Sequence, residues 1–180
     1  MAPADQLTVA RMAAAPVIVA LYAVDFTGHD YWATTIFAIA MATDWFDGWL
    51  ARRSGSPSAM GSLLDPVADK ILVLAVLIVL LDEGVFAGWM VAAIVAREFL
   101  VSGLRLAALE RGIVLGARDL GKLKTWTQSV AAILGGFAAG GSLDESIAWW
   151  ALLAALVVTL VSGLDYARLA PGLLRSRVTA

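Results

Sequence analysis

Four aspartates stand in two short stretches of the sequence, at spacings that suit a helix. Asp44 and Asp47 form the first pair, and Asp65 and Asp69 form the second. Spacings of three and four residues place the members of each pair on one face of an α-helix. Carboxylate oxygens are the ligands that Mg²⁺ and Mn²⁺ prefer, together with water and substrate phosphate. The pattern therefore predicts a site for two divalent cations, Mg²⁺ or Mn²⁺, which would neutralise a diphosphate during an in-line displacement.

The segment between the two pairs predicts how they meet. Residues 54–58 are rich in Ser, Gly and Pro, which is typical of a turn. If the helices on either side form an antiparallel hairpin, Asp44 lies level with Asp69, and Asp47 or Gly48 lies level with Asp65. All four carboxylates would then border one small volume near the ends of both helices. Acids inside a membrane are rare and mark candidate functional sites.

Two simpler interpretations of these faces remain open. The acids could form inert salt bridges with Arg52, Lys70 and Arg97, although four acids in register favour a metal site. Small residues also lie on the acidic faces, and they would leave room for a flat or bulky ligand. Small residues equally allow tight helix packing in membranes. They are Gly48, Ala51 and Gly61.

The composition defines the setting of this site. Of the 180 residues, 61% are apolar and 16% are charged, against about 45–50% and about 25% in soluble domains. These values exclude a disordered chain, a basic nucleic-acid-binding domain and an ordinary soluble enzyme. The chain has no cysteine and one histidine, which excludes disulfides, thiolate ligands and a multi-histidine metal site. We therefore expect an integral membrane protein in the lipid bilayer, without a nucleic-acid partner.

Six hydrophobic stretches have about the length that a transmembrane helix requires, roughly 20 residues. We therefore predict an all-α integral membrane fold that forms a single domain over residues 1–180. A short interfacial segment at 3–11 would lead into the first span. The predicted spans are about 9–25, 31–52, 61–81, 86–109, 122–140 and 146–168.

The positions of lysine and arginine predict the orientation. The breaks near 25–30, 82–88 and 140–145 contain acidic residues but no lysine or arginine. Most basic residues fall at the other ends of the spans. Under the positive-inside rule, both termini and the two basic connections are cytoplasmic. The four acids then lie on the cytoplasmic side of a multi-pass protein of the cell (inner) membrane.

The complete pattern D-x2-D-G-x2-A-R-x8-G-x3-D-x3-D, from Asp44 to Asp69, resembles the signature of the CDP-alcohol phosphotransferases. These are integral membrane enzymes of phospholipid synthesis. The stretches 97–105, 120–125 and 161–166 are similar to the phosphatidylglycerophosphate synthase branch of that family. The resemblance implies transfer of the phosphatidyl group of CDP-diacylglycerol to sn-glycerol 3-phosphate, giving phosphatidylglycerophosphate and CMP. It also implies six helices and a homodimer.

The resemblance implies a role for each residue of the pattern. The metal ligands would be Asp44, Asp47, Asp65 and Asp69. Asp69 would also be the general base that removes the proton of the acceptor hydroxyl. The cytidine nucleotide would be bound by Asp47, Gly48, Ala51, Arg52 and Gly61.

The acceptor carries a phosphate, so basic residues should lie beside the acids. The candidates are Arg105, Arg118, Lys122 and Lys124. The two lysines follow Gly121 at an expected helix N-terminus, where backbone amides also favour anions. For Arg118, attraction to anionic lipid headgroups is an equal alternative. Arg97 and Glu98 are expected to form a structural ion pair or to support the site.

Three other functions are weighed against this one. A related transferase could use another acceptor: inositol phosphate, serine or phosphatidylglycerol. A divalent-cation transporter would need ionisable residues through the outer half of the spans, where the sequence offers no such series. A noncatalytic membrane scaffold would leave the register of the four acids without a reason.

Overall fold

The computed structural model describes residues 3–24, 26–54, 59–110 and 119–175, and these ranges contain six α-helices and no strands. For residues 3–9, 44–54, 59–66, 69, 119 and 169–175 only the backbone is described. The helices are α1 (Pro3–Ala23), α2 (His29–Ser54), α3 (Ala59–Asp82), α4 (Gly88–Leu109), α5 (Asp119–Ala139) and α6 (Glu145–Arg175).

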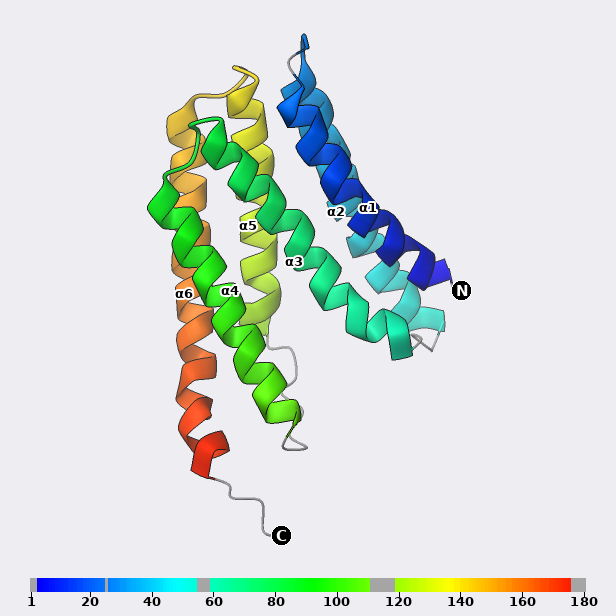
Figure 1. Ribbon diagram of the computed structural model, residues 1–180, viewed down its shortest axis with the longest axis vertical. Helices are drawn as coiled ribbons and strands as arrows, with labels where there is room; N and C mark the ends of the chain where they lie inside the picture. The colour runs from blue at the N-terminus through cyan, green and yellow to red at the C-terminus, as the bar shows by residue number, and fades with distance from the viewer. Residues whose placement is uncertain (1–2, 25, 55–58, 111–118, 176–180) are drawn as a thin grey trace.

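The six helices run alternately up and down the long axis of the molecule (Figure 1). The connections α1–α2, α3–α4 and α5–α6 gather at the upper end of the view, which we call the outer end. The beginnings of α1, α3 and α5 and the ends of α2, α4 and α6 point the other way, toward what we call the inner end. Every predicted span thus corresponds to one helix. The segment 3–11, expected as a separate interfacial stretch, is instead continuous with the first helix.

The helices pack as two groups that α3 and α5 join. α1 packs against both α2 and α3, while α6 packs most extensively against α5 and also against α4. α5 in turn contacts α2 and α3. Most of the large, fully buried side chains at these contacts are apolar, and they include Phe37, Leu72, Leu77, Met90 and Leu152. Burial of such side chains between helices holds the bundle together.

The connections at the outer end are tight and have recognisable helix ends. Gly84 follows α3 and Gly141 follows α5, with φ of +79° and +75°. Glycine is favoured at both points because its missing Cβ permits this left-handed conformation. At the start of α6, the Asp144 carboxylate accepts a hydrogen bond of 2.8 Å from the backbone N–H of Ser146. Asp144 therefore caps the N-terminus of α6.

By length and apolar composition, one described stretch, Glu145–Arg168 in α6, is suited to crossing a membrane, and Ala10–Ala23 is apolar but shorter. α4 carries Arg97, Glu98 and Arg105 along its length, and these charges lower its apolar character. The predicted spans are confirmed as helices, and α6 has the composition expected of a membrane span.

Candidate active site

The four aspartates of the predicted metal site lie in α2 and α3. Asp44 and Asp47 belong to the last turns of α2, and Asp65 and Asp69 belong to the first turns of α3. Asp44 and Asp69 are equally far from the ends of their helices, about 15 Å at a rise of about 1.5 Å per residue. Asp47 and Asp65 are about 9–11 Å from those ends by the same measure. The backbone thus places both pairs at matching depths from the α2–α3 connection.

The side chains of these aspartates, of Ala51 and of Arg52 are not among those that the structure describes, and for Gly48 and Gly61 only the backbone is described. Metal ligation, nucleotide binding and the predicted level pairing of the acids therefore stay predictions. Among the described side chains, no group of three or more His, Asp or Glu residues could hold a metal ion. The described contacts of α2 are chiefly with α1 and α5, and those of α3 are chiefly with α1, α5 and α4.

A buried charged cluster connects α4, α5 and α6. The Glu98 carboxylate accepts a hydrogen bond of 2.8 Å from Nη1 of Arg97 and another from Nζ of Lys124. Nη2 of Arg97 donates to the Ser162 hydroxyl at 2.8 Å. All four residues are buried. The expected Arg97–Glu98 ion pair is confirmed, and Lys124 joins it from the next helix.

Lys70 extends this cluster to α3. Its Nζ donates a hydrogen bond of 2.5 Å to the Ser102 hydroxyl, which donates in turn to the Glu98 carbonyl oxygen at 2.6 Å. The charge of Lys70 also lies close enough to interact with those of Glu98, Arg105 and Arg97. Since Lys70 directly follows Asp69, the cluster adjoins the backbone of the predicted metal site.

The other residues predicted to bind the phosphate of the acceptor substrate lie in different environments. Arg105 is half-buried on α4, and its Nη2 donates a hydrogen bond of 2.9 Å to the hydroxyl of Tyr166 on α6. Lys122 is exposed on the first turn of α5. Arg118 lies outside the described residues. Arg105 of α4 and Lys124 of α5 thus lie on two helices that both pack against α6, one held by a phenol and the other by a carboxylate.

Three hydroxyl groups on one face of α6 accept hydrogen bonds from polar side chains of α4 and α5. Thr159, Ser162 and Tyr166 are separated by three and four residues, which places them on the same face. Thr159 accepts a hydrogen bond of 2.8 Å from Nε2 of Gln128, while the other two accept from arginines of α4. This face of an otherwise apolar helix therefore orients polar side chains of both α4 and α5.

The charges of this region favour an anion. Lys70, Arg97 and Lys124 bring three positive charges close to the carboxylate of Glu98, so the four groups together are cationic. Charge inside a protein is costly unless it is compensated by a partner. A phosphate group bound near these side chains would supply that compensation, and phosphate is the group that the predicted acceptor carries.

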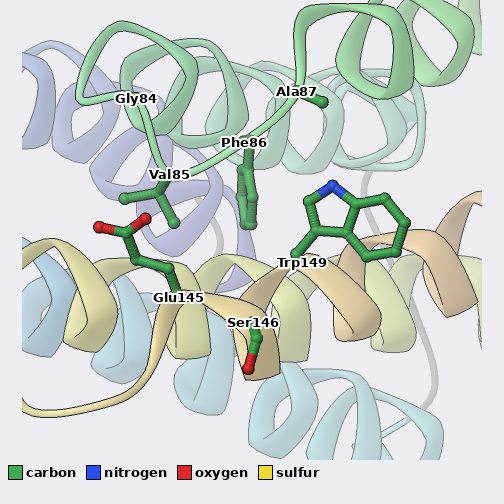
Figure 2. A pocket seen from close by; sticks show the side chains of 7 residues that line it. All are labelled: Gly84, Val85, Phe86, Ala87, Glu145, Ser146 and Trp149. Atoms are coloured by element: carbon green, nitrogen blue, oxygen red, sulfur yellow. The ribbon is translucent and has the colours of Figure 1, made fainter.

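A hollow of about 340 Å³ at the outer end is separate from this region. It lies between the α3–α4 connection and the first turns of α6, and Figure 2 shows Val85 and Phe86 directed from that connection toward α6. Glu145 and Trp149 border it from α6. Among the predicted site residues whose side chains the structure describes, none borders this hollow.

Residues that the sequence did not single out complete the cluster. The partners Ser102, Ser162 and Tyr166 become evident only when the helices are packed together. One signal was available for α6, where hydroxyl residues recur at helical spacing within an apolar helix, and Tyr166 ends one of the stretches noted for its resemblance. Ser102 lies within another of those stretches, 97–105, but nothing in the sequence indicates its contact with Lys70.

Comparisons with known proteins identify the family that the pattern of the four acids resembles. The sequence model of the CDP-alcohol phosphatidyltransferase family matches residues 1–161. The CDP-diacylglycerol–glycerol-3-phosphate 3-phosphatidyltransferase of Bacillus subtilis (strain 168) is 43% identical over 133 residues, which is 73% of this chain and 69% of the relative. The enzyme of that name from Escherichia coli (strain K12) is 39% identical over 130 residues, 69% of this chain and 71% of the relative.

A third relative covers more of the chain. The "Probable phosphatidylglycerophosphate synthase" of Mycobacterium tuberculosis (strain ATCC 25618 / H37Rv) is 38% identical over 168 residues. This match spans 91% of the present chain and 78% of the relative. It therefore extends across the helices that carry the buried charged cluster as well as those that carry the acids.

Proposed function

Because this chain belongs to the CDP-alcohol phosphatidyltransferase family, we propose that it transfers the phosphatidyl group of CDP-diacylglycerol to sn-glycerol 3-phosphate. The products are phosphatidylglycerophosphate and CMP. The observation that carries this proposal is the similarity, at 38–43% identity, to relatives named for that reaction or for its product. The cationic cluster supports the choice of an acceptor that carries phosphate.

Enzymes of this family generally use divalent metal ions, and the donor set of this chain fits such ions. The proposed ligands, Asp44, Asp47, Asp65 and Asp69, provide only carboxylate oxygens, and hard cations such as Mg²⁺ and Mn²⁺ bind such oxygens. The matching depths of the two acid pairs along α2 and α3 agree with a shared site. Two bound cations would stabilise the negative charge of the diphosphate and of the departing CMP.

The chain's own residues perform the remaining steps. Asp69 takes the proton of an acceptor hydroxyl as that oxygen attacks the phosphorus bonded to diacylglycerol. A new phosphorus–oxygen bond forms, and the bond between this phosphorus and the oxygen of CMP breaks. The nucleotide is held by Asp47, Gly48, Ala51, Arg52 and Gly61. No covalent intermediate on the protein is needed.

The phosphate of the acceptor binds beside this site, at the cationic side chains of α4 and α5. Arg105, Lys122 and Lys124 are the proposed ligands, with Arg118 as a further one. Arg97 and Lys70 add positive charge close to these ligands. Holding the acceptor by its phosphate orients its hydroxyl for attack, and such orientation accounts for a large part of enzymatic rate enhancement.

We propose that all six helices cross the inner membrane, with both termini and the site on the cytoplasmic side. In the sequence, most lysines and arginines fall toward the ends of the spans opposite the α1–α2, α3–α4 and α5–α6 connections, and those connections contain none, as the positive-inside rule requires. Arg97, Glu98 and Lys124 are buried against one another, which is the arrangement that charged residues adopt inside membranes. As the family resemblance implies, we expect a homodimer in the bilayer.

The reaction can be tested with the purified full chain in detergent. We expect CMP release from CDP-diacylglycerol in the presence of Mg²⁺ or Mn²⁺ when glycerol 3-phosphate is added. Inositol phosphate, serine and phosphatidylglycerol serve as matched alternative acceptors. Faster CMP release with one of these would overturn the assigned acceptor, and an absence of CMP release with every acceptor would overturn the transferase activity.

A further inference from the structure

We propose that Tyr166 is a positioning residue for the acceptor phosphate, acting through Arg105. This inference rests on the proposed function, in which Arg105 binds that phosphate. Tyr166 touches neither substrate in this scheme. It fixes the direction in which the guanidinium of Arg105 presents its N–H groups.

Two contacts fix the guanidinium. Nη2 of Arg105 donates a hydrogen bond of 2.9 Å to the Tyr166 hydroxyl, and the Arg105 Cζ atom lies 5.2 Å from the centroid of the Tyr166 ring. The second distance is that of a cation–π contact. A hydrogen bond and a ring contact from the same residue restrict both the position and the plane of the guanidinium. Since a guanidinium carries five N–H donors, binding Tyr166 is compatible with binding a phosphate.

Tyr166 is itself held firmly enough to serve this purpose. It is 5% exposed, on the inner half of α6. Its hydroxyl reaches the first turn of α5, where a Cβ added to Gly121 would lie 3.9 Å from the hydroxyl oxygen. Lys122 directly follows that glycine, and Lys124, which donates to the Glu98 carboxylate, comes two residues later. The tyrosine hydroxyl is thus located between the α4 and α5 segments that supply the proposed phosphate ligands.

The same helix provides a matched control. Thr159 is fully buried on the same face of α6 and accepts a hydrogen bond from Gln128. Neither Thr159 nor Gln128 contacts a proposed phosphate ligand in the interactions described above. Thr159→Val and Tyr166→Phe each remove one buried hydroxyl that accepts a hydrogen bond from a neighbouring helix. Only Tyr166→Phe deprives an arginine of the proposed site, Arg105, of a hydrogen-bond acceptor.

The experiment measures kcat and both KM values for the full chain in detergent, as wild type, Tyr166→Phe and Thr159→Val. Tyr166→Phe retains the ring and its packing but loses the hydroxyl. We expect it to raise the KM for glycerol 3-phosphate by about three- to tenfold, with the KM for CDP-diacylglycerol unchanged. Thr159→Val should leave the ratio of the two KM values at the wild-type value.

A second measurement separates this inference from the proposed reaction. Inorganic phosphate should raise the unfolding temperature of the wild type and of Thr159→Val, and higher phosphate concentrations should be needed for Tyr166→Phe. If the wild type fails to use glycerol 3-phosphate but this difference in phosphate binding is observed, the reaction is wrong and the positioning role stands. Wild-type values for Tyr166→Phe in both measurements would overturn the inference. Equal changes in both KM values, shared by Thr159→Val, would also overturn it.

Discussion

Lys124 of α5 and Glu98 of α4 form an ion pair inside the bundle, and the two residues are only 8% and 3% exposed. The sequence assigns Lys124 to the acceptor phosphate, so the structure adds a carboxylate partner to a proposed phosphate ligand. A phosphate at Lys124 would also lie near Glu98, and the charges of Arg97 and Lys70 would offset the resulting repulsion. The same ion pair therefore joins α4 to α5 and contributes charge to the proposed phosphate site.

Removal of the Glu98 carboxylate should destabilise the protein. In Glu98→Ala, the buried Arg97 and Lys124 lose their shared partner, and breaking a buried pair in this way costs about 3–5 kcal/mol. Glu98→Gln should cost less because an amide oxygen can still accept a hydrogen bond. Thermal unfolding in detergent measures both effects.

Glu110→Gln is the matched control for Glu98→Gln, because Glu110 is an exposed acid at the end of the same helix. It removes the same charge and should leave the unfolding temperature nearly unchanged. Equal unfolding temperatures for Glu98→Ala and the wild type would contradict a stabilising role for the pair.

Asp69→Asn should abolish turnover while preserving much of the nucleotide binding. The amide retains the shape of the side chain but cannot accept the proton of the attacking hydroxyl. CMP release measures turnover, and equilibrium binding of CDP-diacylglycerol measures the first step. Asp82→Asn, at the exposed outer end of the same helix, should retain wild-type activity. Near-normal CMP release from Asp69→Asn would exclude Asp69 as the base.

Removal of divalent cations should stop CMP release. The four proposed ligand carboxylates and a diphosphate would repel one another at a shared site unless cations neutralised them. Treatment with a chelator should abolish the activity, and excess Mg²⁺ or Mn²⁺ should restore it. Monovalent salt at the same ionic strength is the control. Full activity in the chelator would argue against the proposed metal site.

Gly136→Ala should destabilise the contact between α2 and α5. An added Cβ would lie 2.7 Å from the Tyr22 hydroxyl oxygen and closer still to the Thr34 hydroxyl oxygen. Overpacking of this kind costs about 1–3 kcal/mol. Gly103→Ala is the control, since a Cβ at Gly103 on α4 meets nothing within 4 Å. The two variants are compared by thermal unfolding, and equal stabilities would contradict the close approach at Gly136.

Asp144→Ala should lower the unfolding temperature at neutral pH by removing the cap of α6. The hydrogen bond from Ser146 lowers the pKa of the Asp144 carboxyl below its usual value of 3.8. A lowered pKa in the folded state means that the stabilisation is complete above the usual pKa and is lost as the pH falls through the lowered one. The difference between variant and wild type should therefore shrink below about pH 3.8.

Asp144→Asn is the control for this pH dependence. Asparagine also caps helices well, but its amide does not titrate in this range. Its unfolding temperature should stay close to that of the wild type at neutral pH. A gap between Asp144→Ala and the wild type that is the same at every pH would contradict the ionised cap.

The helices were predictable because apolar stretches of sufficient length and polar breaks are properties of the sequence itself. The four acids were equally evident, since a period of three and four residues places them on helix faces without any knowledge of packing. The exact ends of the helices could not be predicted. The first helix begins at Pro3, well before the expected span. Its first turns contain both polar and apolar residues, so the hydropathy of this stretch does not indicate a membrane span.

The partners across helices could not be predicted. The adjacent positions of Arg97 and Glu98 indicated their ion pair, but the contacts of Lys124 with Glu98 and of Arg105 with Tyr166 join residues far apart in the sequence. Such contacts depend on how the helices rotate and approach one another. A single sequence contains no direct record of these rotations, so the orienting role of the α6 hydroxyl groups became evident only from the structure.

The close contact of α2 with α5 at Gly136 has a mechanical consequence for the acids. Thr34, near the beginning of α2, meets α5 at that glycine, and nearby Tyr31 donates a hydrogen bond of 2.5 Å to the Gly140 carbonyl oxygen. Asp44 and Asp47 lie on the opposite half of α2, about 15–20 Å further along the helix. A tilt of α2 about this contact would therefore change the distance between its acids and those of α3. The helix backbone would keep the spacing between Asp44 and Asp47 constant.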